Sequence, residues 1–518
     1  MAEIAGPAPI RPSEPIAVRT AVASRTRTRL LAFPLHQRFL AALVMLYVAK
    51  ALILVFVFPP FSGHDETAHY SYIRTVVDEH RVPTLLEEPS LGDARQTRGN
   101  DYVDLLPREL YTYCRYTLQW WCDPMDLAHS GGPVYVTRWG SESNLQADGV
   151  QYAANHPPLY YLIMAPIYWL SERAGASDVT QMYLLRLAAI PFGLAVVLLA
   201  YFTTRLIFPR DVFLLITVPA FVALQTQISY EAAMVNNDIV AIAAFSWILY
   251  LVVRAIRDRF PARTSLLIGF ALGLGIIAKS TSITAAAIIG VAMLTLIGFQ
   301  STERFRASLP KFVRTGLLIA APALALAAPW YIHMYRTYGN FTALPQILKL
   351  QHMWNKPDGS FFQLLFSVDF FKLRFSELWG EYGWRVLPFA PHLMQIIAVP
   401  TIIAALGFIL FAIRTLNRTG LGDRVGRLDR WQFWALAIML VACIVGYLFT
   451  VQFGTQFALT QARYFFPVIN ALALLLMLGL RTLIPVRWHL AGSTLLITAL
   501  VALNVFVVSS YVIPYYWL

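Results

Sequence analysis

Residues 39–70 read FLAALVMLYVAKALILVFVFPPFSGHDETAHY, and this stretch decides the fold class. Residues 39–58 are predominantly apolar, with Lys50 as the charged exception. A helix that crosses a bilayer needs about 20 such residues. The run is longer than the apolar core of a signal peptide and lacks a small-residue cleavage site, so we expect an uncleaved transmembrane helix. Two prolines and an acidic motif, HDETAHY, follow it directly.

The composition of the whole chain indicates an integral membrane protein. Hydrophobic residues make up 58% and charged residues 14% of the 518 residues, whereas a typical soluble domain carries about 25% charge. Further apolar segments of roughly 20 residues recur, and no alternating pattern of a transmembrane β-barrel is present. The sequence therefore predicts an all-α polytopic membrane protein with about eleven transmembrane helices. The predicted spans are residues 39–58, 183–206, 212–230, 237–254, 264–279, 281–299, 313–333, 393–413, 431–452, 463–481 and 489–510.

The basic residues predict the orientation. Arginines cluster in alternate connections, for example around Arg257 and around Arg427, which the positive-inside rule assigns to the cytoplasmic side. The net charge of +12 therefore reflects membrane topology and not nucleic-acid binding. We expect a disordered cytoplasmic tail (1–38), the first transmembrane helix (39–58), a first outer loop (59–182), a helical bundle (183–333), a second outer loop (334–392) and a second bundle (393–518).

Residues 156–170 (HPPLYYLIMAPIYWL) test this topology. The segment is apolar but short for a span, and counting it as a span would place the later arginine clusters outside. Its aromatic side chains suit the headgroup layer of a membrane. We therefore predict an interfacial or re-entrant helix on the outer side.

The acidic motif has two interpretations. Ser62 and Asp65 have the spacing of a helix capping box, and acids favour the first turn of a helix. Alternatively, Asp65 and His69 lie one helical turn apart beside the bilayer, where a carboxylate could take a proton from an acceptor hydroxyl. Glu66 would then orient a partner or, with Asp65, hold a divalent metal, a question that the residues leave open. The histidine spacing differs from that of the HExxH metalloproteases.

Several charged side chains are predicted on the same outer side. Cations at membrane depth are costly and frequently functional, although at helix ends they also snorkel to headgroups. Lys50 lies deeper, and we expect it to pair with a buried acid or carbonyl. The residues at the outer ends of spans or beside the interfacial helix are His156, Arg186, Asp238, Lys279 and Arg463.

The chain contains few cysteines. Cys114 and Cys122 both fall in the first outer loop, in the sequence CRYTLQWWC. Because the outer face is oxidising in most compartments, we predict a local disulfide between them, the alternative being two unrelated thiols. Cys443 falls within a span and is expected to pack there.

The order of these motifs resembles that of the GT-C membrane glycosyltransferases, in particular the branch of protein O-mannosyltransferases and aminoarabinose transferases. The matching segments are PPFSGHDETAHY (59–70), NHPPLYYL (155–162), LLRLAAIPFGLAVVLLAYFTTRLIF (184–208), MVNNDIVA (234–241), GLGIIAKSTS (273–282) and QARYFFP (461–467).

This resemblance implies an inverting transfer of a sugar from a polyprenyl-phosphate donor to a glycan, lipid or protein acceptor. The transfer would take place on the outer face of a membrane, here the plasma membrane of a bacterium. Asp65 maps onto the family's base within the pair Asp65–Glu66, and Lys279, Arg463 and, less directly, Arg186 map onto its phosphate-binding cations. His69, Tyr70, His156 and Asp238 are then expected to contact the acceptor or to position other groups. Two rival functions stay open, a lipid or glycan transporter (flippase) and a non-catalytic scaffold for envelope assembly.

Overall fold

The structure is a computed structural model, and it describes residues 34–85, 110, 113, 116, 151–298, 301–350, 359–417, 424–425, 428–457 and 460–518. The predicted cysteine pair, Cys114 and Cys122, lies outside the described residues, so the disulfide stays a prediction. Within the described part the strands are short. They are β1 (Leu387–Pro388), β2 (Arg424–Val425) and β3 (Leu428–Asp429), of which β2 and β3 pair antiparallel, with Arg424 opposite Asp429.

Helices make up the rest of the regular structure. The longer helices are α2 (Leu35–Val57), α3 (Glu66–Asp78), α5 (Leu159–Arg173), α6 (Asp178–Ile207), α7 (Val212–Leu224), α9 (Asp238–Asp258), α10 (Ala262–Ala278), α11 (Thr284–Met293), α12 (Thr302–Tyr338), α15 (Val368–Trp379), α17 (Pro391–Leu416), α18 (Arg430–Gly454), α19 (Ile469–Leu483) and α20 (His489–Val507). The shorter ones are η5 (Tyr152–Asn155), α8 (Thr226–Glu231), η6 (Ser280–Ile283), η7 (Leu294–Leu296), α13 (Leu344–Leu350), α14 (Phe361–Leu365), α16 (Tyr382–Arg385), η8 (Ala462–Val468), η9 (Val486–Trp488), η10 (Val508–Val512) and α21 (Ile513–Trp517).

The apolar helices coincide with the predicted spans. Among the described residues, eight helices are long and apolar enough to cross a membrane, and three shorter apolar helices, Val212–Leu224, Ala262–Ala278 and Ser280–Leu296, accompany them. Each of the eleven predicted spans overlaps one of these helices. The prediction of an all-α polytopic membrane protein is therefore confirmed.

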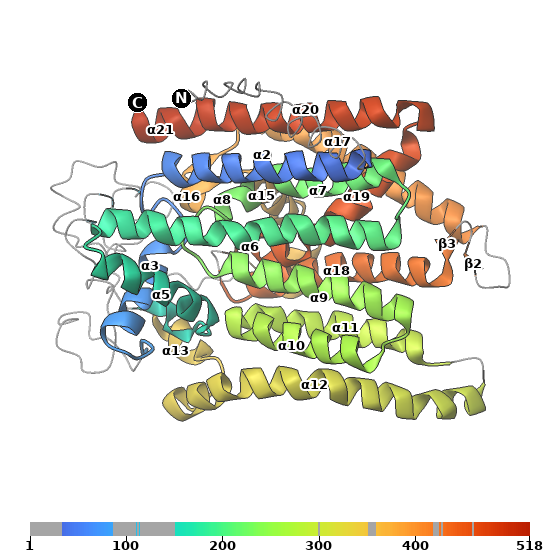
Figure 1. Ribbon diagram of the computed structural model, residues 1–518, viewed down its shortest axis with the longest axis horizontal. Helices are drawn as coiled ribbons and strands as arrows, with labels where there is room; N and C mark the ends of the chain where they lie inside the picture. Colours follow the sequence, from blue (N-terminus) through green and yellow to red (C-terminus); the bar gives the residue numbers. More distant parts are fainter. Residues whose placement is uncertain are drawn as a thin grey trace, which may run out of the picture.

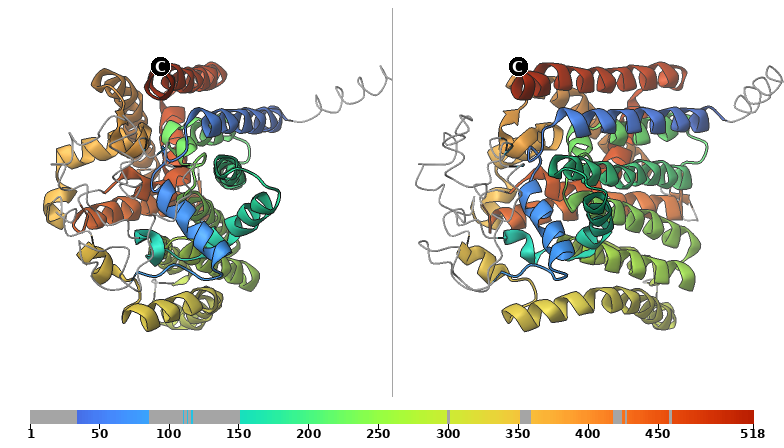
Figure 2. Two further views of the ribbon diagram at one scale, coloured as in Figure 1. Left: turned by 90° about the vertical axis from the view of Figure 1, so that its left-hand side faces the viewer. Right: turned by 60° about the vertical axis from the view of Figure 1, so that its left-hand side comes forward.

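The apolar helices lie side by side, with α3, α5 and α13 gathered at one end of the bundle (Figure 1). We call this the site end, because the charged residues described below lie there. Seen from that end, α3 and α5 lie across the bundle (Figure 2). The segment predicted to be an interfacial helix forms α5, which has 15 residues and packs against α3. Its placement in the membrane interface stays a prediction.

The helices differ in how deeply they are buried within the protein. In α9, 78% of the most apolar 18-residue stretch is buried inside the protein. In α17 and in the segment Val486–Trp517, 17% of the corresponding stretch is buried. α9 therefore occupies the centre of the bundle, and the two peripheral helices present apolar side chains that suit lipid. The residue that begins α9 is Asp238, so this central helix carries a charge at its first position.

α17 and α19 pack unusually closely, and glycine explains why. A Cβ added at Gly479 would lie 1.8 Å from the carbonyl oxygen of Ala404, and one added at Gly407 would lie 2.3 Å from the carbonyl oxygen of Gly479. Real side chains cannot occupy such positions, so only glycine permits this approach. Small residues are the usual means by which membrane helices bring their backbones together.

The predicted span 212–230 is interrupted, which the hydropathy pattern does not reveal. α7 ends at Leu224, Gln225 adopts an extended conformation, and α8 follows at once. The break leaves backbone carbonyls without helical partners, and buried carbonyls need other donors. The Lys50 ammonium donates to the Ala223 carbonyl at 2.5 Å and to the Ser229 hydroxyl at 2.5 Å, while Asn504 donates to the Leu224 carbonyl at 2.7 Å. The expectation that Lys50 pairs with a buried acid or carbonyl is thus confirmed for the carbonyl.

Candidate active site

Asp65 lies at the turn between α2 and α3. Its φ of 57° places it in the left-handed region, which few residues other than glycine adopt. Although Asp65 holds the N-cap position of α3, its side chain makes no capping hydrogen bond, and the Ser62 hydroxyl instead donates to the Pro59 carbonyl at 2.7 Å. The capping interpretation is therefore wrong for Asp65, whose carboxylate accepts a hydrogen bond from Arg463 at 2.5 Å. Glu66 does lie in the first turn of α3, as that interpretation expects, and its carboxylate accepts a hydrogen bond from the Gly63 amide at 2.9 Å.

Four charged side chains meet at this point, and we call them the ion cluster: Asp65, Asp238, Lys279 and Arg463. Arg463 Nη2 binds Asp65 Oδ2 at 2.5 Å and Arg463 Nη1 lies 3.5 Å from Asp238 Oδ2. Lys279 Nζ donates to Asp238 Oδ1. All four residues are buried. Charges in such a setting are held mainly by one another, because water is largely excluded.

The ion cluster is assembled from four separate parts of the chain. Asp65 precedes α3, Asp238 begins α9, Lys279 joins α10 to η6, and Arg463 lies in η8. The pair Asp65–Arg463 spans 398 positions in the sequence. Glu377 of α15 helps to place η8, because its carboxylate accepts a hydrogen bond from the Ala462 backbone amide at 2.9 Å. Sequence reasoning predicted all four cluster residues on one side of the membrane but missed Glu377.

Glu66, the neighbour of Asp65, belongs to a different pair. Its carboxylate binds Arg186 through both oxygens, at 2.9 and 2.6 Å, and both side chains are fully buried. Arg186 also donates to the carbonyls of Val55, Phe58 and Pro59, at the end of α2. The Val235 amide donates to Glu66 at 2.8 Å. We interpret these contacts of Arg186 and Glu66 as structural. The phosphate contact of Arg186 and the role of Glu66 beside the base stay predictions.

The two histidines named from the sequence lie beside the ion cluster. His69 Nδ1 is 2.8 Å from the Tyr161 hydroxyl, His156 Nδ1 is 2.7 Å from Asn237 Nδ2, and the two rings are 5.7 Å apart. Burial lowers the pKa of His69 to about 3 and that of His156 to about 4. Lys279 acts in the same direction on both and His156 does so on His69, while Asp65 and Asp238 oppose the shift. Both imidazoles are therefore neutral at pH 7, and they can donate or accept hydrogen bonds without adding charge.

Tyr70 makes its hydrogen bond with α6 and not with the ion cluster. Its hydroxyl donates to Gln181 of α6 at 3.1 Å. The structure thus brings Asp65, His69, His156, Asp238, Lys279 and Arg463 together, and it places Glu66, Tyr70 and Arg186 in neighbouring contacts that join α3 to α6.

A second buried pair was not foreseen. His64 Nδ1 lies 2.8 Å from Glu231 Oε1, and Gln227 donates to the same oxygen at 3.4 Å. Tyr230 donates to the Ser62 carbonyl at 2.5 Å, which ties the acidic turn to α8. The signal in the sequence was an acid directly after an apolar stretch, ISYE, which the expectation of an unbroken span concealed.

A divalent ion between Asp65 and Glu66 was left open by the sequence. In the structure the two carboxylates bind different arginines and do not converge. Among the described residues, no group of three or more His, Cys, Asp or Glu side chains could hold a metal ion. Asp65 and Glu66, as the structure places them, therefore do not share a metal site.

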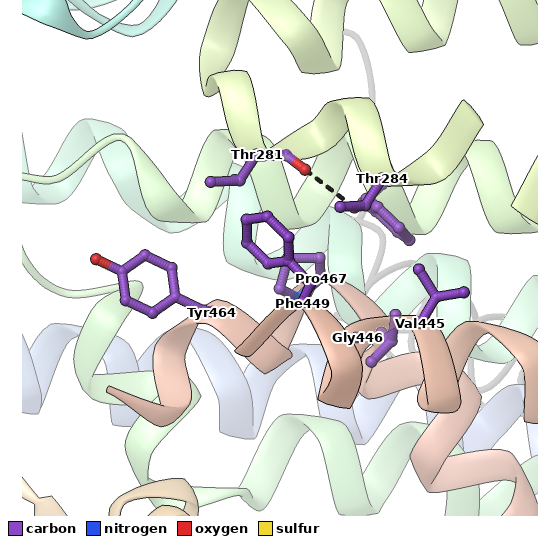
Figure 3. Close-up of a pocket in the computed structure, with 9 residues that line it drawn as sticks. Thr281, Thr284, Val445, Gly446, Phe449, Tyr464 and Pro467 are labelled. Atoms are coloured by element: carbon purple, nitrogen blue, oxygen red, sulfur yellow. Dashed lines mark hydrogen bonds between the residues drawn. The ribbon is translucent and has the colours of Figure 1, made fainter. Parts of the chain in front are cut away.

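An apolar pocket adjoins the ion cluster (Figure 3). Its lining residues come from α9, η6, α11, α18 and η8 and are Phe245, Thr281, Thr284, Val445, Gly446, Phe449, Tyr464, Pro467 and Val468. Tyr464 is shared with the ion cluster, because its ring centroid lies 5.4 Å from Lys279 Nζ and 5.7 Å from Arg463 Cζ. Charged and apolar surfaces thus meet across one tyrosine.

These features define a polytopic helical membrane protein with a buried ion cluster at one end of its bundle. The chain belongs to the family DUF2142, described as a predicted membrane protein, whose model matches residues 50–472. No curated protein matches it.

Two solved structures show what the chain is similar to. The archaeal oligosaccharyltransferase AglB from Archaeoglobus fulgidus, in complex with an inhibitory peptide and a dolichol-phosphate, is 11% identical, with a TM-score of 0.47, over 91% of this chain and 55% of that one. The chain thus spans about half the length of AglB. ArnT from Cupriavidus metallidurans, bound to undecaprenyl phosphate, is 15% identical, with a TM-score of 0.34, over 85% of this chain and 77% of that one.

Proposed function

We propose that this protein transfers a sugar from a polyprenyl-phosphate donor to an acceptor at the outer face of a bacterial plasma membrane. The observation that carries the proposal is the ion cluster, in which Asp65 shares Arg463 with Asp238, and Asp238 also holds a second cation, Lys279. A base and a phosphate-binding pair of cations are the two components that such a transfer needs. The order of motifs that resembles the GT-C glycosyltransferases supports the same function.

The chemistry follows from the charges. The acceptor oxygen attacks the anomeric carbon from the face opposite the phosphate, which inverts the configuration at that carbon. As the new C–O bond forms, the bond from the anomeric carbon to the phosphate oxygen breaks, and its electron pair stays on the phosphate. Asp65 takes the proton of the acceptor hydroxyl, while Lys279 and Arg463 stabilise the charge that grows on the phosphate. No separate acid is required, because a phosphate is a good leaving group.

The surroundings of the ion cluster supply the remaining contacts in this proposal. The lining of the small apolar pocket behind Tyr464 lies next to the cations that would hold the phosphate. As it stands the pocket has room for about one water molecule, so in this proposal it widens when its side chains contact the first carbons of the polyprenyl chain. His69 and His156 would hydrogen-bond hydroxyls of the sugar or of the acceptor. The acceptor itself is a glycan, a lipid or a protein, and the second predicted outer loop, residues 334–392, lies next to the site in the sequence-based topology.

Transfer by the purified protein tests the proposal directly. The protein is reconstituted in nanodiscs with a panel of radiolabelled polyprenyl-phosphate sugars, and sugar release from the lipid is followed with and without envelope extract as acceptor. Lipid analysis of a deletion strain should show an accumulated polyprenyl-phosphate sugar. Movement of the lipid-linked sugar between leaflets without cleavage would favour a flippase. Neither cleavage nor movement would favour a scaffold.

A further inference from the structure

The ion cluster is electrically balanced before any substrate enters. Its two cations, Lys279 and Arg463, face two carboxylates, Asp65 and Asp238. A donor that carries a phosphodiester brings one more negative charge. Because an uncompensated charge in a buried site is costly, a carboxylate has to give up its cations before the phosphate can take them.

We propose that Asp238 occupies the place of the donor phosphate and yields it when the donor binds; this inference rests on the proposed function. Asp238 uses one oxygen for Lys279 and the other for Arg463, which is how a phosphate would bridge the same two cations. Its contact with Arg463 is 3.5 Å long, against 2.5 Å for the contact between Arg463 and Asp65. Of the two contacts that Arg463 makes, the one with Asp238 is therefore the weaker and the first to break, whereas the close contact between Asp238 and Lys279 breaks only when the phosphate takes over Lys279.

The position of Asp238 keeps the free-energy cost of this release small. It is the first residue of α9, a 21-residue helix, and a carboxylate there stays stabilised by the helix dipole after its cations leave. The side-chain oxygen of the preceding residue, Asn237, is buried and accepts no hydrogen bond. The turn before α9 therefore holds a hydrogen-bond acceptor that the described donors of the protein do not use. Asp238 thus acts as a positioning residue that keeps Lys279 and Arg463 ready for an anion.

The same arrangement balances charge during the transfer. With the donor bound, the ion cluster and the phosphodiester together carry one negative charge. After the transfer the lipid phosphate has gained one negative charge, and Asp65 has lost one by taking the proton. The total is unchanged. Arg463 therefore passes from Asp65 to the phosphate in the same step in which Asp65 no longer needs it.

The test is the affinity of wild type and Asp238→Asn for undecaprenyl phosphate in nanodiscs, together with KM and kcat for the donor. Without the competing carboxylate, we expect roughly 10-fold tighter binding, a lower KM and a lower kcat because the product lipid leaves slowly. Asp211→Asn is the matched control. It removes the same charge from the pair Asp211–Arg481, which joins the start of α7 to the last turn of α19, keeps a good helix cap, and should leave affinity unchanged.

Equal or weaker binding to Asp238→Asn, with normal binding to wild type, would overturn this inference and leave the proposed function standing. Wild type that binds no undecaprenyl phosphate would remove the proposed function and this inference with it. If Asp238→Asn does not fold, infrared difference spectra of the wild-type protein provide the second measurement. Adding the lipid should shift an ionised carboxylate band as Asp238 leaves its cations, and an unchanged spectrum would overturn the inference.

Discussion

Two adjacent carboxylates in this protein have opposite surroundings. Glu66 is fully buried and held by Arg186, which also binds backbone carbonyls at the end of α2, so every contact belongs to the scaffold. Asp65 is held by Arg463, which is shared with Asp238 and borders an apolar pocket through Tyr464. A pair that is closed on itself stabilises the fold, whereas a pair that shares its cation with another acid can exchange partners. We therefore assign Glu66 to the scaffold and propose a chemical role for its neighbour, Asp65.

Glu66→Gln gives the largest expected effect on stability. It leaves the Arg186 charge unmatched in a fully buried place, so we expect a loss of about 3–5 kcal/mol in the free energy of unfolding. Thermal unfolding of the purified protein in detergent measures it. The double variant Glu66→Gln, Arg186→Met should recover part of the loss, since no unpaired charge remains. A stable Glu66→Gln protein without transfer activity would instead make Glu66 a catalytic residue.

Asp65→Asn should affect activity and spare the fold. Its carboxylate caps no helix, an asparagine tolerates the left-handed backbone at this position, and Arg463 keeps Asp238 as a partner, so we expect a smaller loss of stability than for Glu66→Gln. The transfer rate should fall about 100-fold or more, because an amide cannot take the acceptor proton. Turnover of a polyprenyl-phosphate sugar in nanodiscs is the measurement. Near-normal turnover would exclude Asp65 as the base.

Lys279→Gln is expected to weaken donor binding roughly 10-fold or more, since hydrogen bonds to charged groups contribute about 1.5–3 kcal/mol. Because Lys279 also neutralises Asp238, the change is best combined with Asp238→Asn in a double-mutant cycle. Lys311→Gln, an exposed position on α12, serves as the control. Unchanged donor affinity in Lys279→Gln would return Lys279 to the role of a snorkelling cation.

The smallest effect is expected from low pH, which should lower the free energy of unfolding. Because burial holds the pKa of His69 at about 3 and that of His156 at about 4, the unfolded chain takes up protons near pH 6.5 while the folded protein does not. The free energy of unfolding should therefore be constant with respect to these groups above pH 6.5. Below it, the loss should be about 1.4 kcal/mol per pH unit for each histidine, until the folded pKa is reached. Thermal unfolding at pH 7.5 and 5.5 measures this, and His69→Gln should reduce the dependence. A wild-type protein equally stable at both pH values would contradict it.

The positions of the helices could be predicted from the sequence, because apolar length is a local property that the bilayer imposes. The same reasoning placed Asp65, Asp238, Lys279 and Arg463 at one end of the bundle, since each lies at the end of a span. Which acid pairs with which base could not be predicted. Glu66 and Arg186 are 120 positions apart, and their pairing depends on how α2, α3 and α6 pack.

Two other features escaped the sequence for the same reason. The interruption after α7 depends on Lys50 and Asn504, which come from distant helices and donate hydrogen bonds to the carbonyls that the break leaves without helical partners. Hydropathy alone indicates a continuous span at this place. The contact between His64 and Glu231 joins the acidic turn to the segment after that break. Hydropathy averages over a window, so it detects neither a single extended residue nor the acid that follows it.

The break in α7 has a consequence for biosynthesis. Lys50 enters the membrane with the first helix, but one of its acceptors, Ser229, is 179 positions further along the chain. At about 5–20 residues per second, the ribosome needs roughly 10–35 s to make that segment. Until then the nascent first helix carries a charge that costs about 2.5–3.5 kcal/mol at the bilayer centre. We therefore expect the first helix to reach its final position in the membrane only after the segment that contains Ser229 has been synthesised.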